Sequence, residues 1–419
     1  MAPADPRRPA HHRPRQAQPR PGPRHHRPPP ASSNNASSTS PPSSSCPTPD
    51  SSTTSTTKPA GRSTSGTRCA SCAPVAGDGL FTAYNHEPNW AAAHAILMPA
   101  FTKAAMESYH PTMTATVAEL VDAWSSRADT DAWIDVPAES NRLTTEIVAR
   151  AGIGHSFNKL DDTSDDPPFI TTVLRELKYA NRRTDAIPFY EKLFGKGQRQ
   201  QHQQDKKWLR EQIATIINDR RNAGPHTGPR DMLDYMLNTA DPATGATLDD
   251  ANITNQILTL LVAGSETSAN AIGFALHYLA NHPDIAAEAQ AEIDQRWPER
   301  SVPPDIAFDD VARLRYLRRI VDETLRLWPV APGYFRQAKT TTAIGDGQYQ
   351  FDKGDWVFVL LLAAHRDTAT WGGDDADQFR PDRFLPDNIR ALPPAHLQAL
   401  RHRGPAPASA ASSPSTRSC

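Results

Sequence analysis

Cysteine is nearly missing from this sequence of 419 residues. Cys46, Cys69 and Cys72 lie near the N-terminus and Cys419 is the last residue, so the long middle of the chain contains no cysteine. A fold held by disulfides is therefore excluded, and the middle of the chain suits a reducing compartment. Cys69 and Cys72 form a C-x-x-C pair, but no second pair completes a zinc site, and we expect no metal site made of these side chains.

Long hydrophobic runs and a strong net charge are lacking as well. No apolar run approaches the ~18 residues of a membrane-spanning helix, and the first residues have no apolar segment like that of a signal peptide. The formal net charge is −2, so no positive field over the whole molecule favours nucleic acid. We therefore expect a cytoplasmic protein that binds neither membranes nor nucleic acid.

Apolar residues are scarce because proline-rich sequence dilutes them at the two ends. The chain has 39 prolines and 38% hydrophobic residues, whereas globular domains hold about 5% proline and, with glycine, about 45–50% apolar residues. Residues 1–74 are of low complexity, and residues 396–419 are similar. We expect one globular domain at 75–395, and terminal segments that are disordered or translated out of frame.

Helical spacing of apolar residues dominates the globular region, and strand-like runs come late. The predicted helices cover 89–106, 111–124, 137–153, 169–179, 207–221, 249–282, 283–297 and 311–327. The predicted strands cover 336–344, 356–360 and 362–365. Helices followed by a few strands predict a mainly α domain of the α+β class.

The longest predicted helix has an unusual centre, A-G-S-E-T-S at 263–268. Glycine and hydroxyl residues disfavour a helix interior, and a threonine can donate its hydroxyl to the carbonyl one turn back. One interpretation is a groove where another helix crosses closely. The other is an opened turn that receives a small ligand, with Glu266 and Thr267 delivering protons.

Two other pairs of residues mean little when taken alone. Glu323 and Arg326 lie three residues apart on one helix face, as many solvated ion pairs do. Trp90 and His94 lie one helical turn apart and would most often be core residues, although two donors on one face could hold an anionic group.

Taken together and in order, the motifs resemble the cytochrome P-450 haem-thiolate monooxygenases. A-G-x-E-T on a long helix is followed by E-x-x-R and then by P-x-R-F at 381–384. Further segments are similar to the bacterial self-sufficient fatty-acid hydroxylases, in which a haem domain is fused to a flavin reductase: G-D-G-L-F-T at 77–82, H-E-P-N-W at 86–90, L-R-L-W-P at 325–329 and H-R-D-T at 365–368. The resemblance covers about 75–395 and implies a cytochrome P-450 fold that is incomplete at both ends.

The resemblance also implies an activity and its cofactors. A monooxygenase of this kind inserts one oxygen atom of O2 into a C–H bond of a fatty acid or a similar amphiphile. It uses haem b, and its electrons come from NADPH through an FAD- and FMN-containing reductase that is not part of this chain. Ala263 and Gly264 would lie over the haem where dioxygen binds, Thr267 would hydrogen-bond the dioxygen, and Glu266 would relay protons to it.

The remaining roles come from the resemblance in the same way. Trp90 and His94 would hydrogen-bond a haem propionate. Phe81, Ala263 and Gly333 would line the substrate pocket. A buried charge network would join the last matching set, Glu323, Arg326 and Arg383, in which a guanidinium fork suits a planar bidentate contact.

One part of the family pattern is missing. The family binds the haem iron through the cysteine thiolate of F-x-x-G-x-R-x-C-x-G, shortly after P-x-R-F. After Phe384 this chain has no cysteine before Cys419, and nothing like that motif surrounds Cys419. We therefore expect the chain, as its sequence reads, to lack the iron ligand and to be inactive.

The genetic code offers an explanation for the missing part. Codons compatible with 396–402, read from each second base, can encode T-F-K-P-F-G-T. Codons compatible with 405–417, read from each third base, can encode R-A-C-I-G-R-Q-F-A-L-H-E, which resembles the missing loop, and the cysteine codon would straddle those of Pro407 and Ala408. Residues 51–73 behave alike. We infer that both ends are translated out of frame, in the gene or through a sequencing error.

Two alternatives stay open from the sequence. The chain could be a catalytically silent, haem-less helical remnant, which is what the sequence literally encodes. It could also be a peroxide-driven hydroxylase on the same fold, although the intact Glu266–Thr267 pair favours activation of dioxygen.

Overall fold

The structure is a computed structural model that describes residues 76–83, 87–128, 130, 133–157, 160, 167–185, 196–224, 228–299 and 306–392. Both segments that we expect to be disordered or out of frame, 1–74 and 396–419, lie outside these residues. The four cysteines lie outside them too.

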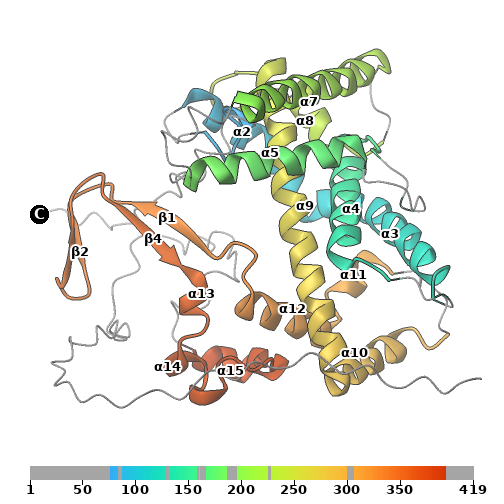
Figure 1. The fold of residues 1–419 in the computed structure, drawn as a ribbon, viewed down its shortest axis with the longest axis vertical. Coiled ribbons are helices and arrows are strands. Elements are labelled where there is room, and N and C mark those ends of the chain that lie inside the picture. The colour runs from blue at the N-terminus through green and yellow to red at the C-terminus, as the bar shows by residue number, and fades with distance from the viewer. Residues whose placement is uncertain are drawn as a thin grey trace, which may run out of the picture. The chain divides into compact units, whose positions relative to one another are not determined.

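Helix α9, Asp250–Asn281, is the long helix on which the others are arranged (Figure 1). Its 32 residues make a rod about 48 Å long. Asp249 caps its start by accepting from the backbone N–H of Asn252 at 2.7 Å, and α10, Pro283–Arg296, begins directly after it. The predicted long helix is therefore confirmed at both ends.

Most other predicted helices are present, with bounds that differ by several residues. The packing partners of α9 include α4 (Val136–Ile147), the π-helix η2 (Val148–Gly152), α7 (Lys196–Asn222), α8 (Met232–Asn238), α10 and α12 (Arg315–Leu327). The remaining helical elements are α2 (Pro88–Leu97), η1 (Met98–Phe101), α3 (Lys103–Ser125), α5 (Pro168–Asp185), α11 (Phe308–Val311), α13 (Leu361–Ala364), α14 (Thr368–Trp371), η3 (Gly373–Asp375), η4 (Pro381–Phe384) and α15 (Pro386–Ala391).

The predicted break between 106 and 111 is wrong, because α3 runs through Pro111. The actual boundary is Thr102, whose hydroxyl accepts from the backbone N–H of Ala105 at 3.3 Å and caps α3. Pro111 removes one backbone hydrogen bond at an exposed position, whereas Tyr109 and Leu120 are buried on either side of it. Packing of the flanking turns therefore holds the helix together.

Four short strands form two separate antiparallel pairs. β1 (Gly333–Gln337) pairs with β4 (Trp356–Leu360), and β2 (Thr342–Ile344) pairs with β3 (Tyr349–Phe351). A Cβ at Gly333 would lie 2.4 Å from the Phe358 ring and 2.5 Å from the Val359 carbonyl oxygen, so the β1–β4 pairing requires glycine there. The strand predicted at 362–365 is wrong: that apolar run is too short for its period to be read, and it forms α13.

The main hydrophobic core lies where α2, α5, α7, α8 and α9 meet. Buried members from these helices include Ile96, Phe169, Ile213, Leu233 and Ile257. By length and composition, α9 is the one helix among the described residues that could cross a membrane, a test that core helices of other proteins also pass. Its packing against helices on several sides is that of a core helix.

A buried acid and an imidazole join α5 to α7. Nδ1 of His202 lies 2.6 Å from a carboxylate oxygen of Glu176, and both side chains are buried. The Tyr179 ring stacks on His202 with centroids 4.5 Å apart. Beside them Arg175 donates twice to Asp205, at 2.6 and 3.0 Å. Burial, followed by the nearby Asp205 charge, raises the pKa of Glu176 to about 7.

This raised pKa predicts how stability depends on pH. Between the ordinary carboxyl pKa and about 7 the folded state binds the proton more tightly than the unfolded state, so the contribution of Glu176 is lost as pH rises through 7. We expect Glu176→Gln to flatten the fall in the free energy of unfolding between pH 5 and 8 by on the order of 1 kcal/mol. Glu211→Gln, on an exposed face of α7, is the control. Urea unfolding at several pH values measures both, and equal slopes for the parent and Glu176→Gln would contradict the prediction.

Candidate functional site

The centre of α9 is a continuous helix whose hydroxyl groups bond within it. Thr267 donates its hydroxyl to the carbonyl of Ala263 at 2.7 Å, and Ser265 donates to the carbonyl of Leu261 at 2.5 Å. The predicted threonine back-bond is therefore confirmed. No opened turn interrupts α9 between Asp250 and Asn281.

Glycine at 264 allows α4 and η2 to approach α9 closely. A Cβ at Gly264 would lie 2.8 Å from a methyl group of Val148, so a side chain there would force the two helices apart. Across the same contact the hydroxyl of Thr144 donates to the carbonyl of Ser265 at 2.9 Å. The interpretation as a packing groove is thus correct for this side of the helix. On another side of α9, Ala263 is exposed and Thr267 half-buried.

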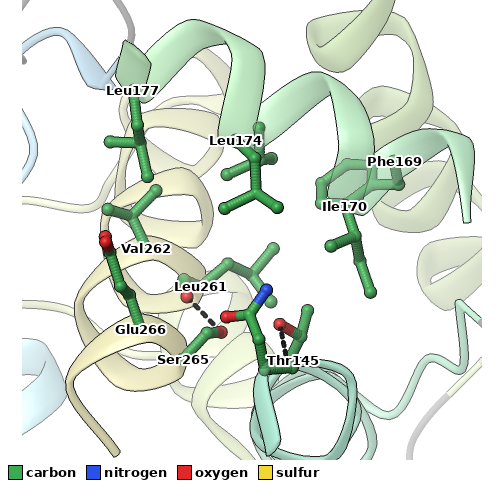
Figure 2. Close-up of a pocket in the computed structure, with 11 residues that line it drawn as sticks. Thr145, Phe169, Ile170, Leu174, Leu177, Leu261, Val262, Ser265 and Glu266 are labelled. Carbon is green, nitrogen blue, oxygen red and sulfur yellow. Dashed lines mark hydrogen bonds between the residues drawn. The ribbon is translucent and has the colours of Figure 1, made fainter. Parts of the chain in front are cut away.

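Beside this helix lies an apolar cleft between α4, α5 and α9 (Figure 2). In Figure 2, Leu174 and Leu177 of α5 face Val262 of α9, and Glu266 stands at the end of the cleft beside Val262. Hydroxyl groups at its floor are satisfied within their own helices, since Thr145 donates to the carbonyl of Asn141 at 2.7 Å. The cleft therefore presents mainly hydrocarbon surface, with the side chains of Asn141 and Glu266 as its other polar lining groups.

Among the residues that line the cleft, Glu266 is the one to which the sequence assigns a functional role. The others are Asn141, Thr145, Phe169, Ile170, Val173, Leu174, Leu177, Leu261, Val262 and Ser265. A signal was present, because the apolar residues from 169 to 177 recur at helical spacing. The spacing shows which face of α5 is apolar but does not show that part of this face borders a cleft.

Trp90 and His94 lie together on α2, as their spacing predicts. Their rings stack with centroids 5.0 Å apart and planes inclined by 19°. The indole N–H of Trp90 donates to the carbonyl of Leu80 at 3.2 Å, whereas His94 is exposed. An anionic group at this position would reach His94 directly and would compete with Leu80 for the indole N–H.

The three residues predicted to line a substrate pocket come from three elements. Phe81 lies in the loop 76–83 and is 58% exposed, Ala263 is on α9, and Gly333 begins β1. Contacts join the Phe81 loop to α9, because Gln256 accepts from the backbone N–H of Leu80 at 2.9 Å. The contacts of Gly333, in contrast, are with β4.

The predicted charge network around Glu323 and Arg326 is formed and fully buried. Arg326 donates to the two carboxylate oxygens of Glu323 at 2.6 and 2.8 Å, and neither side chain has exposed surface. Its remaining donors reach the backbone carbonyls of His365 and Ala376 at 2.8 and 2.7 Å, and that of Gln378 at 3.3 Å. One guanidinium therefore holds α12 against the segment 365–378.

Arg383 joins this network at a greater distance. Its Nε lies 3.4 Å from Glu323, and its Nη2 donates to the Asp375 carboxylate at 2.8 Å. Further bonds reach the carbonyls of Trp371 and Asp375. The three residues that the sequence predicts are thus together, with backbone carbonyls and Asp375 as partners that the sequence did not reveal.

Replacing Arg326 tests what this network contributes. Arg326→Lys keeps the charge but loses the fork, so buried carbonyls are left without donors; we expect the free energy of unfolding to fall by about 3–5 kcal/mol. The control Arg318→Lys changes an exposed pair with Asp322 on the same helix and should alter it by less than about 0.5 kcal/mol. Urea unfolding followed by circular dichroism measures both. Similar decreases in the free energy of unfolding in the two variants would show that the buried network stabilises the fold no more than an exposed ion pair does.

The comparisons with known proteins agree with the motifs. The family model described as Cytochrome P450 matches residues 57–399. A crystal structure of a cytochrome P450, CYP102L1, superposes with a TM-score of 0.75 and 57% sequence identity, covering 79% of this chain and 73% of that one.

Two bacterial relatives add the context of a longer protein. "Bifunctional cytochrome P450/NADPH--P450 reductase 2" of Bacillus subtilis (strain 168) is 39% identical over 308 residues, which is 74% of this chain and 28% of the relative. "Bifunctional cytochrome P450/NADPH--P450 reductase" of Bacillus cereus is 39% identical over 310 residues, with the same coverage. The chain thus spans little more than a quarter of the length of these relatives.

Proposed function

Because this chain belongs to the cytochrome P450 family and has its fold, we propose that it is the haem domain of a monooxygenase that inserts one oxygen atom of O2 into a C–H bond of a fatty acid or a similar amphiphile. The observation that carries the proposal is the central part of α9: an exposed Ala263 and the Thr267 hydroxyl on one side, with an apolar cleft ending at Glu266 next to it.

An alkyl chain suits the surfaces around α9. The cleft offers leucine, isoleucine, valine and phenylalanine side chains, and the hydroxyl groups of Thr145 and Ser265 that line it are already paired. Phe81 presents an exposed aromatic ring from a loop bound to the same helix. Burying hydrocarbon on such surfaces stabilises a complex by about 25 cal/mol per Å². These features support an amphiphile with a long apolar part.

The described residues fit a haem on one side only. Ala263 offers a small side chain to a planar group, and His94 offers an exposed imidazole to a propionate. A thiolate that could bind the haem iron has no source among them, because every cysteine of the chain lies outside the described residues. No group of three or more metal-binding side chains occurs within the described residues either. We infer that the ligand is encoded in another reading frame, and that the chain as its sequence reads is inactive.

When bound in this family, haem supplies the activation of dioxygen, and the side chains of α9 handle protons. Thr267 can release its hydroxyl from the Ala263 carbonyl and donate it toward a ligand on that side. Glu266, exposed one residue earlier, can exchange protons with solvent. A flavin reductase that takes electrons from NADPH is the proposed partner, since the bacterial relatives are named as fusions with one.

The haem ligand is the first point to test. We expect the chain as its sequence reads to bind haem weakly, and its reduced carbon monoxide complex to lack the Soret band of a thiolate ligand. Restoring the frame across 396–417 should recover the band, and replacing the restored cysteine with serine, as the matched control, should abolish it. A thiolate spectrum from the unchanged chain would contradict the frame inference.

Thr267→Ala tests proton delivery in the frame-restored protein supplied with a reductase. Loss of the hydroxyl should leave the fold intact while NADPH consumption continues, product falls by about tenfold or more, and peroxide rises. Ser268→Ala removes an adjacent, exposed hydroxyl and is the matched control. The measurement is the amount of product formed per NADPH consumed. If this ratio were unchanged in Thr267→Ala, the proposed role of Thr267 in proton delivery would be excluded.

One alternative has an observation in its favour. A catalytically silent, haem-less helical remnant is consistent with the absence of cysteine from the described residues. Iron bound by the frame-restored protein but not by the chain as its sequence reads would support the frame inference, whereas iron in neither protein would favour the remnant. Location in the cytoplasm stays a prediction.

A further inference from the structure

The loop 76–83, which carries Phe81, is tightly folded and lies directly on α9. Within the loop, the backbone N–H groups of Thr82 and Ala83 donate to the carbonyl of Gly79 at 2.9 and 2.8 Å, and the Thr82 hydroxyl donates to that of Gly77 at 2.7 Å. Phe81 nevertheless remains 58% exposed. The position of this loop on α9 therefore determines the position of the Phe81 ring.

Two glycines allow this close contact. Gly77 has φ +55°, and a Cβ there would lie 2.5 Å from the amide of Asn255. A Cβ at Gly79 would lie 2.0 Å from the Thr259 hydroxyl and 2.9 Å from the Asn255 carbonyl. Because both positions exclude a side chain, polar groups of the loop come within hydrogen-bonding distance of α9.

Asn255 links this loop to α7 through one amide group. Its Nδ2 donates to the Asp78 carboxylate at 2.6 Å, while its Oδ1 accepts from Arg210 of α7 at 2.8 Å. Reversing the amide would place its N–H donors against the Arg210 guanidinium and its oxygen against the Asp78 carboxylate, so neither bond could form. Asparagine therefore satisfies a carboxylate and a guanidinium at once, in one orientation.

Other bonds set the carboxylate and the loop backbone around this amide. The second carboxylate oxygen of Asp78 accepts from Asn89 of α2 at 2.6 Å. Burial raises the pKa of Asp78, but the bonds from Asn89, Asn255 and Asn252 outweigh it and hold that pKa below its ordinary value. The carboxylate thus stays charged at neutral pH and remains a strong acceptor.

We propose that Asn255 is a positioning residue for Phe81: its amide fixes the loop 76–83 between α9 and Arg210 of α7, and so sets how the aromatic ring meets the alkyl part of the substrate. The proposal rests on the proposed function for its substrate, but the attachment of the loop can be measured without it. α7 also packs on α5, whose leucines line the apolar cleft. Helix α7 therefore contacts α5 and, through Arg210 and Asn255, also the loop that carries Phe81.

The test exchanges the two partners in the full chain. Asn255→Asp keeps an acceptor for Arg210 but opposes Asp78 with a second carboxylate, so hydrogen exchange at the backbone amides of Leu80, Thr82 and Ala83 should rise by about tenfold. Adding Asp78→Asn reverses donor and acceptor and should return exchange to within about threefold of the parent. Amides of Ile257 and Leu258 should stay protected throughout, which distinguishes loop release from unfolding. The control Gln212→Ala lies on an exposed position of α7.

Ligand binding is measured on the same proteins with a saturated C16 fatty acid by calorimetry. Asn255→Asp should weaken binding by about three- to tenfold, and the double variant with Asp78→Asn should restore the affinity to within about twofold of the parent. The proposal would be overturned if Asn255→Asp changed neither the hydrogen exchange of the loop amides nor the affinity for the fatty acid. It would also be overturned if the double variant failed to restore both. A parent chain that binds no fatty acid would contradict the proposed substrate, while the amide exchange would still decide whether Asn255 holds the loop.

Discussion

A fully buried guanidinium is the constraint on which the C-terminal half of the described chain depends. Arg326 has no exposed surface, and a charge in such a place is tolerated only when every donor is paired. Glu323 balances its charge, and carbonyls at 365, 376 and 378 take its remaining donors. Because those carbonyls belong to a segment with little regular structure, the guanidinium substitutes for the backbone ladder that the segment lacks. The turn at 381–384, after which the family places its haem ligand, is held in the same network through Arg383.

Helix α9 presents different kinds of side chain on its different sides, because its centre combines small, hydroxyl and apolar residues. Gly264 lets α4 and η2 come close, and the hydroxyls of Ser265 and Thr267 are paired within the helix, which leaves it unbroken. Leu261 and Val262 border an apolar cleft, while Ala263 and Thr267 lie on another side of the helix, which we propose faces the haem. Toward its start, Asn255 and Gln256 hold the Phe81 loop. One helix thus carries residues for packing together with those that we propose contact an apolar ligand and deliver protons.

The sequence predicted the helices well because their apolar residues recur at a regular period. The charge network followed from the resemblance to the cytochrome P-450 family, whose motifs contain Glu323, Arg326 and Arg383. It failed where tertiary contacts outweigh local signals. The cap at Thr102 and buried neighbours carry α3 through Pro111, and the short apolar run at 362–365 forms a helix. The bond from Asn255 to Asp78 joins residues 177 positions apart, so no local pattern could reveal it. The same holds for the cleft, whose walls come from three helices.

The central claim is that a member of the cytochrome P450 family has its iron ligand encoded out of frame. Redetermining the nucleotide sequence of the gene across codons 392–419 tests it most directly. The account predicts that the third-base frame over codons 405–417 is free of stop codons and carries a cysteine codon spanning the codons of Pro407 and Ala408. A stop codon in that frame, or another residue in place of the cysteine, would contradict it.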